Sequence, residues 1–166
     1  ARTVADAKAL NIGVIAYCRL IMNADIDMYI AFDGIRIGEL MAKTIVNSVP
    51  NGRYVIVNGS HTDYNSQMYN QGIHNILQEY VQNDRISIVD EIWANDWQPD
   101  EAQRAVERIV AQGAEIDAII CGNDTLAEAV IKVLARYGLA GTVNVTGHDA
   151  DLSGFKHTLD GTQLMT

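Results

Sequence analysis

Short apolar runs alternate with longer segments of helical periodicity along most of the sequence, and this alternation constrains the fold more than any other feature. A continuous apolar run bounded by turn residues is typical of a strand buried on both faces of a parallel sheet. Alternating strands and helices require right-handed crossovers, which place helices on both faces of the sheet. The sequence therefore predicts a three-layer α/β sandwich around a parallel sheet. The expected strands are 12–17, 53–58, 86–92, 116–121 and 143–146.

Turn and cap residues mark several helix boundaries. Pro99, followed by two acidic residues, predicts a helix start, and Gly113 lies where a C-terminal glycine cap belongs. Asp124 is expected to cap the next helix, which leaves Asn123 to face the edge of the sheet. Further helices are expected at 1–10, 37–45, 68–81 and 152–159, with irregular chain at 20–33 that contains an extended segment, and extended chain at 163–166.

Composition excludes several classes of function. The 166 residues carry 12 basic and 21 acidic side chains, a net charge of −9, which is a poor match for nucleic acid or anionic lipid. No apolar run reaches the roughly 18–20 residues of a membrane span. The two cysteines and four histidines show no metal-ligand spacing, and no phosphate-binding glycine motif is present. We therefore expect no metal and no cofactor.

The residues that follow the expected strands include polar side chains that can hydrogen-bond to hydroxyls, and aromatic side chains. Ligands of open parallel sheets bind beyond the carboxyl ends of the strands, so these positions are the candidate site. They include Arg19, Trp97, Asn123 and Asp149. Carboxylates and amides pair with vicinal hydroxyls, and an indole covers the apolar face of a sugar ring. This chemistry fits a neutral, polyhydroxylated ligand.

Five longer segments carry a family resemblance: AYCRLIMNADIDMYIAFDGIRIGELMAK (16–43), NGSHTDYNS (58–66), WANDWQPDEA (93–102), CGNDTLAEA (121–129) and TGHDADLSGFKHTLDGTQLMT (146–166). They resemble the bacterial periplasmic sugar-binding proteins of ABC import systems, and most closely the branch that takes D-xylose. The resemblance implies the periplasmic binding protein type I fold, in which two α/β lobes close on a sugar across a hinge. It assigns 1–19 to the end of the first lobe and the hinge strand, 20–162 to the second sugar-binding lobe, and 163–166 to the start of a hinge crossing.

The resemblance also implies roles for individual residues. Trp97 would stack on the sugar, Asn123 and Asp149 would bond its hydroxyls, and Arg19 would reach a hydroxyl or the ring oxygen. Cys18 stands where the family's Y-D-R motif has a sugar-binding aspartate. A thiol is a weak donor and acceptor, so one strong hydrogen bond should be lost and the choice of aldose is left open.

Simpler structural roles compete with these assignments. Trp97 could roof the core, and Arg19 could pair with Asp33. Trp93 is expected to serve packing rather than the sugar, and Asp151 to cap the short helix that follows it.

The functional expectation is a non-enzymatic monosaccharide-binding protein. It would be periplasmic, or extracellular and membrane-anchored. Its partner would be a membrane permease or a membrane sensor such as a histidine kinase or chemoreceptor, with no nucleic acid bound and no membrane insertion of this segment. The alternative is the effector-binding domain of a lactose-repressor-type transcription regulator, which would need a helix-turn-helix upstream. A small α/β enzyme would need a nucleophile, a phosphate loop or an acidic metal cluster at the strand ends.

Overall fold

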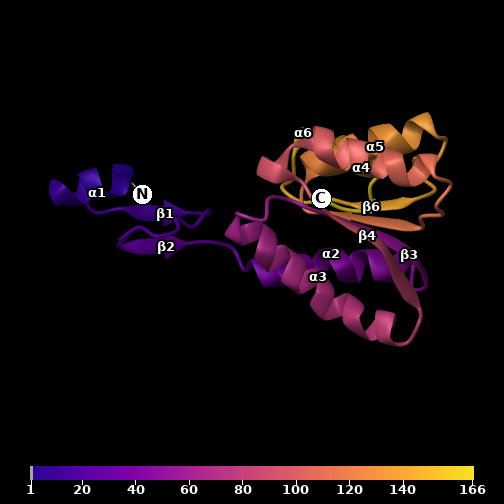
Figure 1. Cartoon of the computed structure of the whole chain (residues 1–166), viewed down its shortest axis with the longest axis horizontal. Helices are drawn as coiled ribbons and strands as arrows, with labels where there is room; N and C mark the ends of the chain where they lie inside the picture. Colours follow the sequence, from indigo (N-terminus) through magenta and orange to yellow (C-terminus); the bar gives the residue numbers. More distant parts are fainter. Residues whose placement is uncertain (1) are drawn as a thin grey trace.

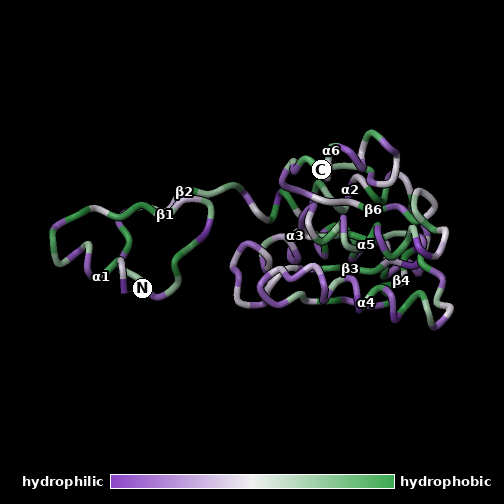
Figure 2. The backbone as a smooth tube through the Cα atoms, turned by 90° about the horizontal axis from the view of Figure 1, so that it is seen from above, coloured by the Kyte–Doolittle hydropathy of each residue, from purple (hydrophilic) through white to green (hydrophobic). Residues whose placement is uncertain are grey.

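The computed structural model describes residues 2–166 and shows two bodies of unequal size (Figure 1). The smaller, N-terminal body contains α1 (Arg2–Ala9), β1 (Ile15–Tyr17) and β2 (Met28–Ile30), and its two strands pair in parallel. The larger body contains all the later elements, and Figure 2 shows the same separation from above. Among residues 2–166, no helix is long and apolar enough to cross a membrane.

The larger body is built on a parallel sheet of four strands in the order β4-β3-β5-β6. These are β3 (Gly52–Asn58), β4 (Ile86–Trp93), β5 (Ala118–Cys121) and β6 (Asn144–Thr146). Beyond β6, Met165 forms a parallel bridge with Thr146, so the expected extended chain at 163–166 runs beside the sheet edge. Because all strands point the same way, their carboxyl ends meet at one edge of the sheet.

Helices cover both faces of this sheet, which confirms the predicted three-layer α/β fold. The helices are α2 (Gly34–Ser48), α3 (Tyr64–Gln82), α4 (Pro99–Ala111), α5 (Asp124–Arg136) and α6 (Leu152–Leu159), with a short 3₁₀ turn, η1, at Asn95–Trp97. Alternate residues of β3 point to opposite faces, as strand geometry requires. Tyr54 and Ile56 pack with the buried stripes of α2 and α3, whereas Val55 and Val57 pack with those of α4 and α5.

Two glycines let α2 and α3 approach closely. A Cβ atom added at Gly38 would lie 2.0 Å from the Tyr69 carbonyl oxygen, and one added at Gly72 would lie 2.0 Å from the Ile35 carbonyl oxygen. The two helix backbones therefore touch where any larger side chain would separate them. This contact fixes the position of α3, whose first turn lies at the edge of the sheet where the carboxyl ends of the strands meet.

The predicted burial of the first expected strand is wrong. β1 is not buried on both faces, because Ile15 and Tyr17 remain 60% and 67% exposed. Its strand partner is β2, which lies in the extended segment expected within 20–33. The exposed apolar side chains of β1 therefore form a surface that no other part of residues 2–166 covers.

Candidate functional site

A cavity of about 320 Å³ lies where the carboxyl ends of the strands face the chain that follows β1. It brings together all five residues singled out from the sequence: Cys18, Arg19, Trp97, Asn123 and Asp149. Asn65, Tyr69 and Asp96 complete its lining. A second hollow of about 200 Å³ adjoins it and shares the Arg19, Asp96 and Trp97 walls. The cavity thus lies between the two bodies of the chain.

Trp97 forms a flat wall of this cavity and is held on two sides. Its indole lies directly on the backbone of Gly59, where an added Cβ would come within 2.3 Å of the ring, and beside Gly122. Its Nε1–H donates to Asp63 Oδ2 at 2.9 Å. Residues Asp96 and Trp97 both have left-handed backbones, with φ of 48° and 58°. The local strain is typical of functional loops whose surroundings hold them in place.

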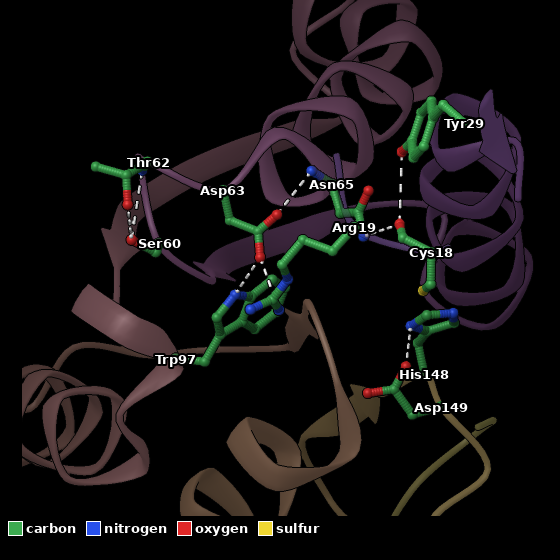
Figure 3. Close-up of polar contacts among 10 residues, drawn as sticks. All are labelled: Cys18, Arg19, Tyr29, Ser60, Thr62, Asp63, Asn65, Trp97, His148 and Asp149. Carbon is green, nitrogen blue, oxygen red and sulfur yellow. Dashed lines mark hydrogen bonds and ion pairs between the residues drawn. The ribbon is translucent and has the colours of Figure 1, made fainter. Parts of the chain in front are cut away.

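Asp63 is the buried anion that organises this wall (Figure 3). Its Oδ1 accepts from the Asn65 backbone N–H at 3.0 Å and caps α3. Its Oδ2 receives both the Trp97 indole and, at 2.9 Å, the Arg19 guanidinium. Arg19 therefore pairs with Asp63 and not with Asp33, which instead caps α2 through the Arg36 N–H.

Cys18 reaches the cavity from a left-handed turn with φ of 64°. Its carbonyl oxygen accepts from Asn65 Nδ2 at 3.0 Å and from the Tyr29 hydroxyl at 3.4 Å. Its thiol is exposed, whereas that of Cys121 is fully buried. The bond from Asn65 links α3 to the turn after β1, as does the Arg19–Asp63 pair.

The cap prediction at the start of α5 is wrong, because Asn123 caps the helix in place of Asp124. Asn123 is the N-cap, and its Oδ1 accepts from the Leu126 N–H at 2.9 Å, although Asn123 also lines the cavity as expected. Asp124 is completely buried. Its carboxylate accepts from Gln163 Nε2 at 2.7 Å, from the Asp151 N–H at 2.9 Å and from the Thr166 hydroxyl. An extended backbone at Asn123 turns its side chain toward the helix terminus.

Asp149 lies on the loop after β6, with φ of 111°. Its Oδ1 lies 2.9 Å from His148 Nδ1. The His148 ring packs edge-on against Tyr69, with centroids 5.1 Å apart, and Tyr69 packs edge-on against Trp97 at 6.5 Å. Burial raises the pKa of Tyr69 to about 12, further above neutral pH than the ordinary value near 10.

Comparison with known proteins identifies the family. The family model described as "Periplasmic binding protein domain" matches residues 1–166. The chain belongs to this family. It is 41% identical over 164 residues to the D-xylose-binding periplasmic protein of Escherichia coli and 37% identical to that of Haemophilus influenzae. These alignments cover 98% of this chain but 50% and 49% of those proteins, so the chain spans about half the length of the curated relatives it matches.

Solved structures agree with the family assignment. A Clostridium phytofermentans ABC transporter solute-binding protein with bound β-D-glucose has a TM-score of 0.85 and 28% identity to this chain. The match covers 98% of this chain and 55% of that one. The resemblance inferred from the sequence is thus confirmed at the level of family and fold. The periplasmic binding protein family consists of solute-binding proteins rather than enzymes.

In this periplasmic binding protein, sequence reasoning missed some residues that line the cavity or the adjoining hollow. Asp63 and Asn65 fall within a segment that carried the resemblance, but neither was assigned a role. Tyr69 lies within the helix expected at 68–81 but was not assigned to its apolar face. Its spacing to Ile73 and Leu77 is the signal that could have found it. Trp93 lies outside the cavity lining, where its ring stacks on His61 at 3.9 Å.

Proposed function

We propose that this chain supplies most of one wall of an interlobe cleft that binds a monosaccharide, with D-xylose or a related aldose as the expected ligand. The observation that carries the proposal is the fixed Trp97 indole facing the same cavity as the polar side chains of Asn123, Asp149 and Arg19. The names of the relatives support it, since those at 41% and 37% identity are D-xylose-binding proteins.

The proposed binding mode assigns separate tasks to stacking and hydrogen bonding. The indole of Trp97 would cover the apolar face of the sugar ring, a contact that orders little additional side chain. Asp149 would accept from hydroxyls, while Asn123 and Arg19 would donate to hydroxyls or to the ring oxygen. Cys18 would make the weakest contact, because a thiol replaces the carboxylate expected from the family motif. The choice among aldoses would therefore rest on the remaining polar groups.

In this proposal, closure of the two lobes is the functional event. Sugar would favour the closed state, because only that state makes both sets of contacts. Residues 1–19 would belong to the first lobe and the hinge strand, 20–162 to the second lobe, and 163–166 to the start of a hinge crossing. The whole protein would be periplasmic, or extracellular and membrane-anchored. It would deliver sugar to an ABC-type permease or present it to a membrane sensor. The relatives' names favour this over a transcription regulator.

A sugar titration followed by NMR tests the proposal. The two tryptophans give two indole N–H signals, and Trp97→Ala and Trp93→Ala variants assign them. Millimolar D-xylose is expected to shift the Trp97 signal and the Asn123 amide, with weak affinity because half of the expected contacts come from outside this chain. Trp97→Ala should weaken binding at least tenfold, as the loss of a buried aromatic anchor does. Trp93→Ala should leave the affinity unchanged. Sugar-induced shifts confined to Trp93, or no shift with any aldose, would contradict the proposal.

A further inference from the structure

We propose that Asp63 is a positioning residue that fixes the Trp97 indole and the Arg19 guanidinium together and thereby links the N-terminal body to the larger body. The inference rests on the proposed function only for its effect on sugar affinity. The positioning itself is a property of the chain without ligand.

The burial of Asp63 is the first step of the argument. Its side chain is only 6% exposed, yet it lies at the border of a cavity. A buried carboxylate is costly unless it is paired and hydrogen-bonded. Here one oxygen accepts the α3 capping bond, and the other accepts from Trp97 and Arg19, both at 2.9 Å. Both oxygens of the carboxylate are therefore engaged by the protein before any ligand binds, and two of these three contacts orient side chains that line the cavity.

The location of its partners is the second step. Trp97 belongs to η1 in the larger body, whereas Arg19 follows β1 in the N-terminal body. One oxygen atom thus joins side chains of both bodies (Figure 3). The adjacent bond from Asn65 of α3 to the Cys18 carbonyl joins the same two bodies. Loss of the Arg19 pair would leave the Asp63 charge buried with fewer partners, so the pair favours the arrangement in which the two bodies meet at the cavity.

The shared acceptor predicts coupling between Trp97 and Arg19. The Trp97 indole and the Arg19 guanidinium both donate to the same Asp63 Oδ2 atom, so each affects the strength of the other's bond. The Trp97 indole signal can therefore report whether the Arg19–Asp63 ion pair is formed. Removing the charge at Asp63 should release Arg19 and weaken the indole bond. Removing Arg19 should change the Trp97 bond even though the two side chains come from different bodies.

A sugar-free NMR experiment tests the positioning role. Asp63→Asn keeps a residue that caps helices well, so α3 should form while the charge is lost. We expect the Trp97 indole N–H signal to shift and to exchange faster with water, and the Arg19 guanidinium to lose its protection from exchange. Asp33→Asn is the matched control, since Asp33 caps α2 away from the cavity, and it should change neither signal. Unchanged Trp97 and Arg19 signals in Asp63→Asn would overturn the proposal.

Arg19→Gln tests the coupling even if the first variant does not fold, because the Arg19 side chain is 69% exposed. Its expected result is a shift of the Trp97 indole signal, and an unshifted signal would refute a shared acceptor. Spin labels at Leu10 and Arg104 in a Cys18→Ser chain would then report the distance between the bodies. Asp63→Asn and Arg19→Gln should each broaden that distribution, and the double variant should broaden it no further. Additive effects would contradict a single link.

Sugar affinity separates this inference from the proposed function. Loss of a charge-assisted hydrogen bond should weaken aldose binding about tenfold in Asp63→Asn. Asp33→Asn should bind as the unmodified chain does. If no aldose binds the unmodified chain while the sugar-free signals behave as expected, the proposed function fails and the positioning role stands. If sugar binds Asp63→Asn as tightly as it binds the unmodified chain, the claim that the positioning supports sugar affinity fails while the proposed function stands.

Discussion

Replacement of Gly59 by alanine should displace the Trp97 ring while leaving the fold intact. The added Cβ would lie 2.3–2.4 Å from three ring carbons of Trp97, whereas non-bonded carbons rest at about 3.5–4.0 Å. The ring must therefore retreat by more than about 1 Å. That movement takes the indole N–H away from Asp63, to which it now donates at 2.9 Å. Overpacking of this kind costs about 1–3 kcal/mol.

Three measurements check this reasoning on the same variant. The Trp97 indole N–H signal should move and exchange faster, the urea midpoint should fall modestly, and aldose affinity should fall. Gly13→Ala is the matched control, because its added Cβ would meet nothing closer than Asp27 Oδ2 at 3.7 Å. An indole signal that coincides with that of the unmodified chain would refute the claim that the Trp97 ring rests on Gly59.

Three further predictions concern the helix contact, pH and ligand choice. Gly72→Ala should lower the free energy of unfolding by about 2–3 kcal/mol, because its Cβ would clash with the Ile35 carbonyl. An unchanged midpoint of urea unfolding would contradict this. The hydrogen bond to Glu91 raises the pKa of His74 above 6.5, and the same bond lowers the pKa of Glu91 below 4.5. The pair therefore stabilises the fold most between about pH 4.5 and 6.5, and this stabilisation is lost at lower and at higher pH. His74→Gln should flatten the pH dependence of the free energy of unfolding measured in urea. An unaltered pH dependence would exclude the pair as its cause. Cys18→Asp should tighten pentose binding in calorimetry, and an unchanged affinity would mean that the cavity does not present this position to the sugar.

The sequence patterns predicted the layers of the fold because burial there is periodic. β3 and β5 are flanked by helices on both faces, so the central residues 54–57 of β3 and all four residues of β5 are apolar and the pattern is clear. The same apolar pattern in β1 gave the wrong environment. An apolar run specifies that a surface is to be covered, but it does not specify which part of the chain covers it.

The site was predictable where it depends on strand ends and not where it depends on loop conformation. Trp97, Asn123 and Asp149 all come shortly after strands, so topology alone places them at one edge. The sequence pattern could not decide that Asn123 and not Asp124 caps α5, because both residue types cap helices well. The decision rests on backbone angles and on Gln163, which is 39 positions away and donates to Asp124.

The two buried carboxylates account for how the cavity loops hold their conformation. Asp96 and Trp97 on one loop, and Asp149 and Ala150 on another, have positive φ, which costs free energy for residues with a side chain. Asp63 bonds the Trp97 indole, and Asp124 bonds the backbone N–H that directly follows Ala150. Each strained loop is thus tied to an anion that would be costly to leave unpaired. The walls are therefore ordered before any ligand arrives, and binding need not supply the entropy of ordering them.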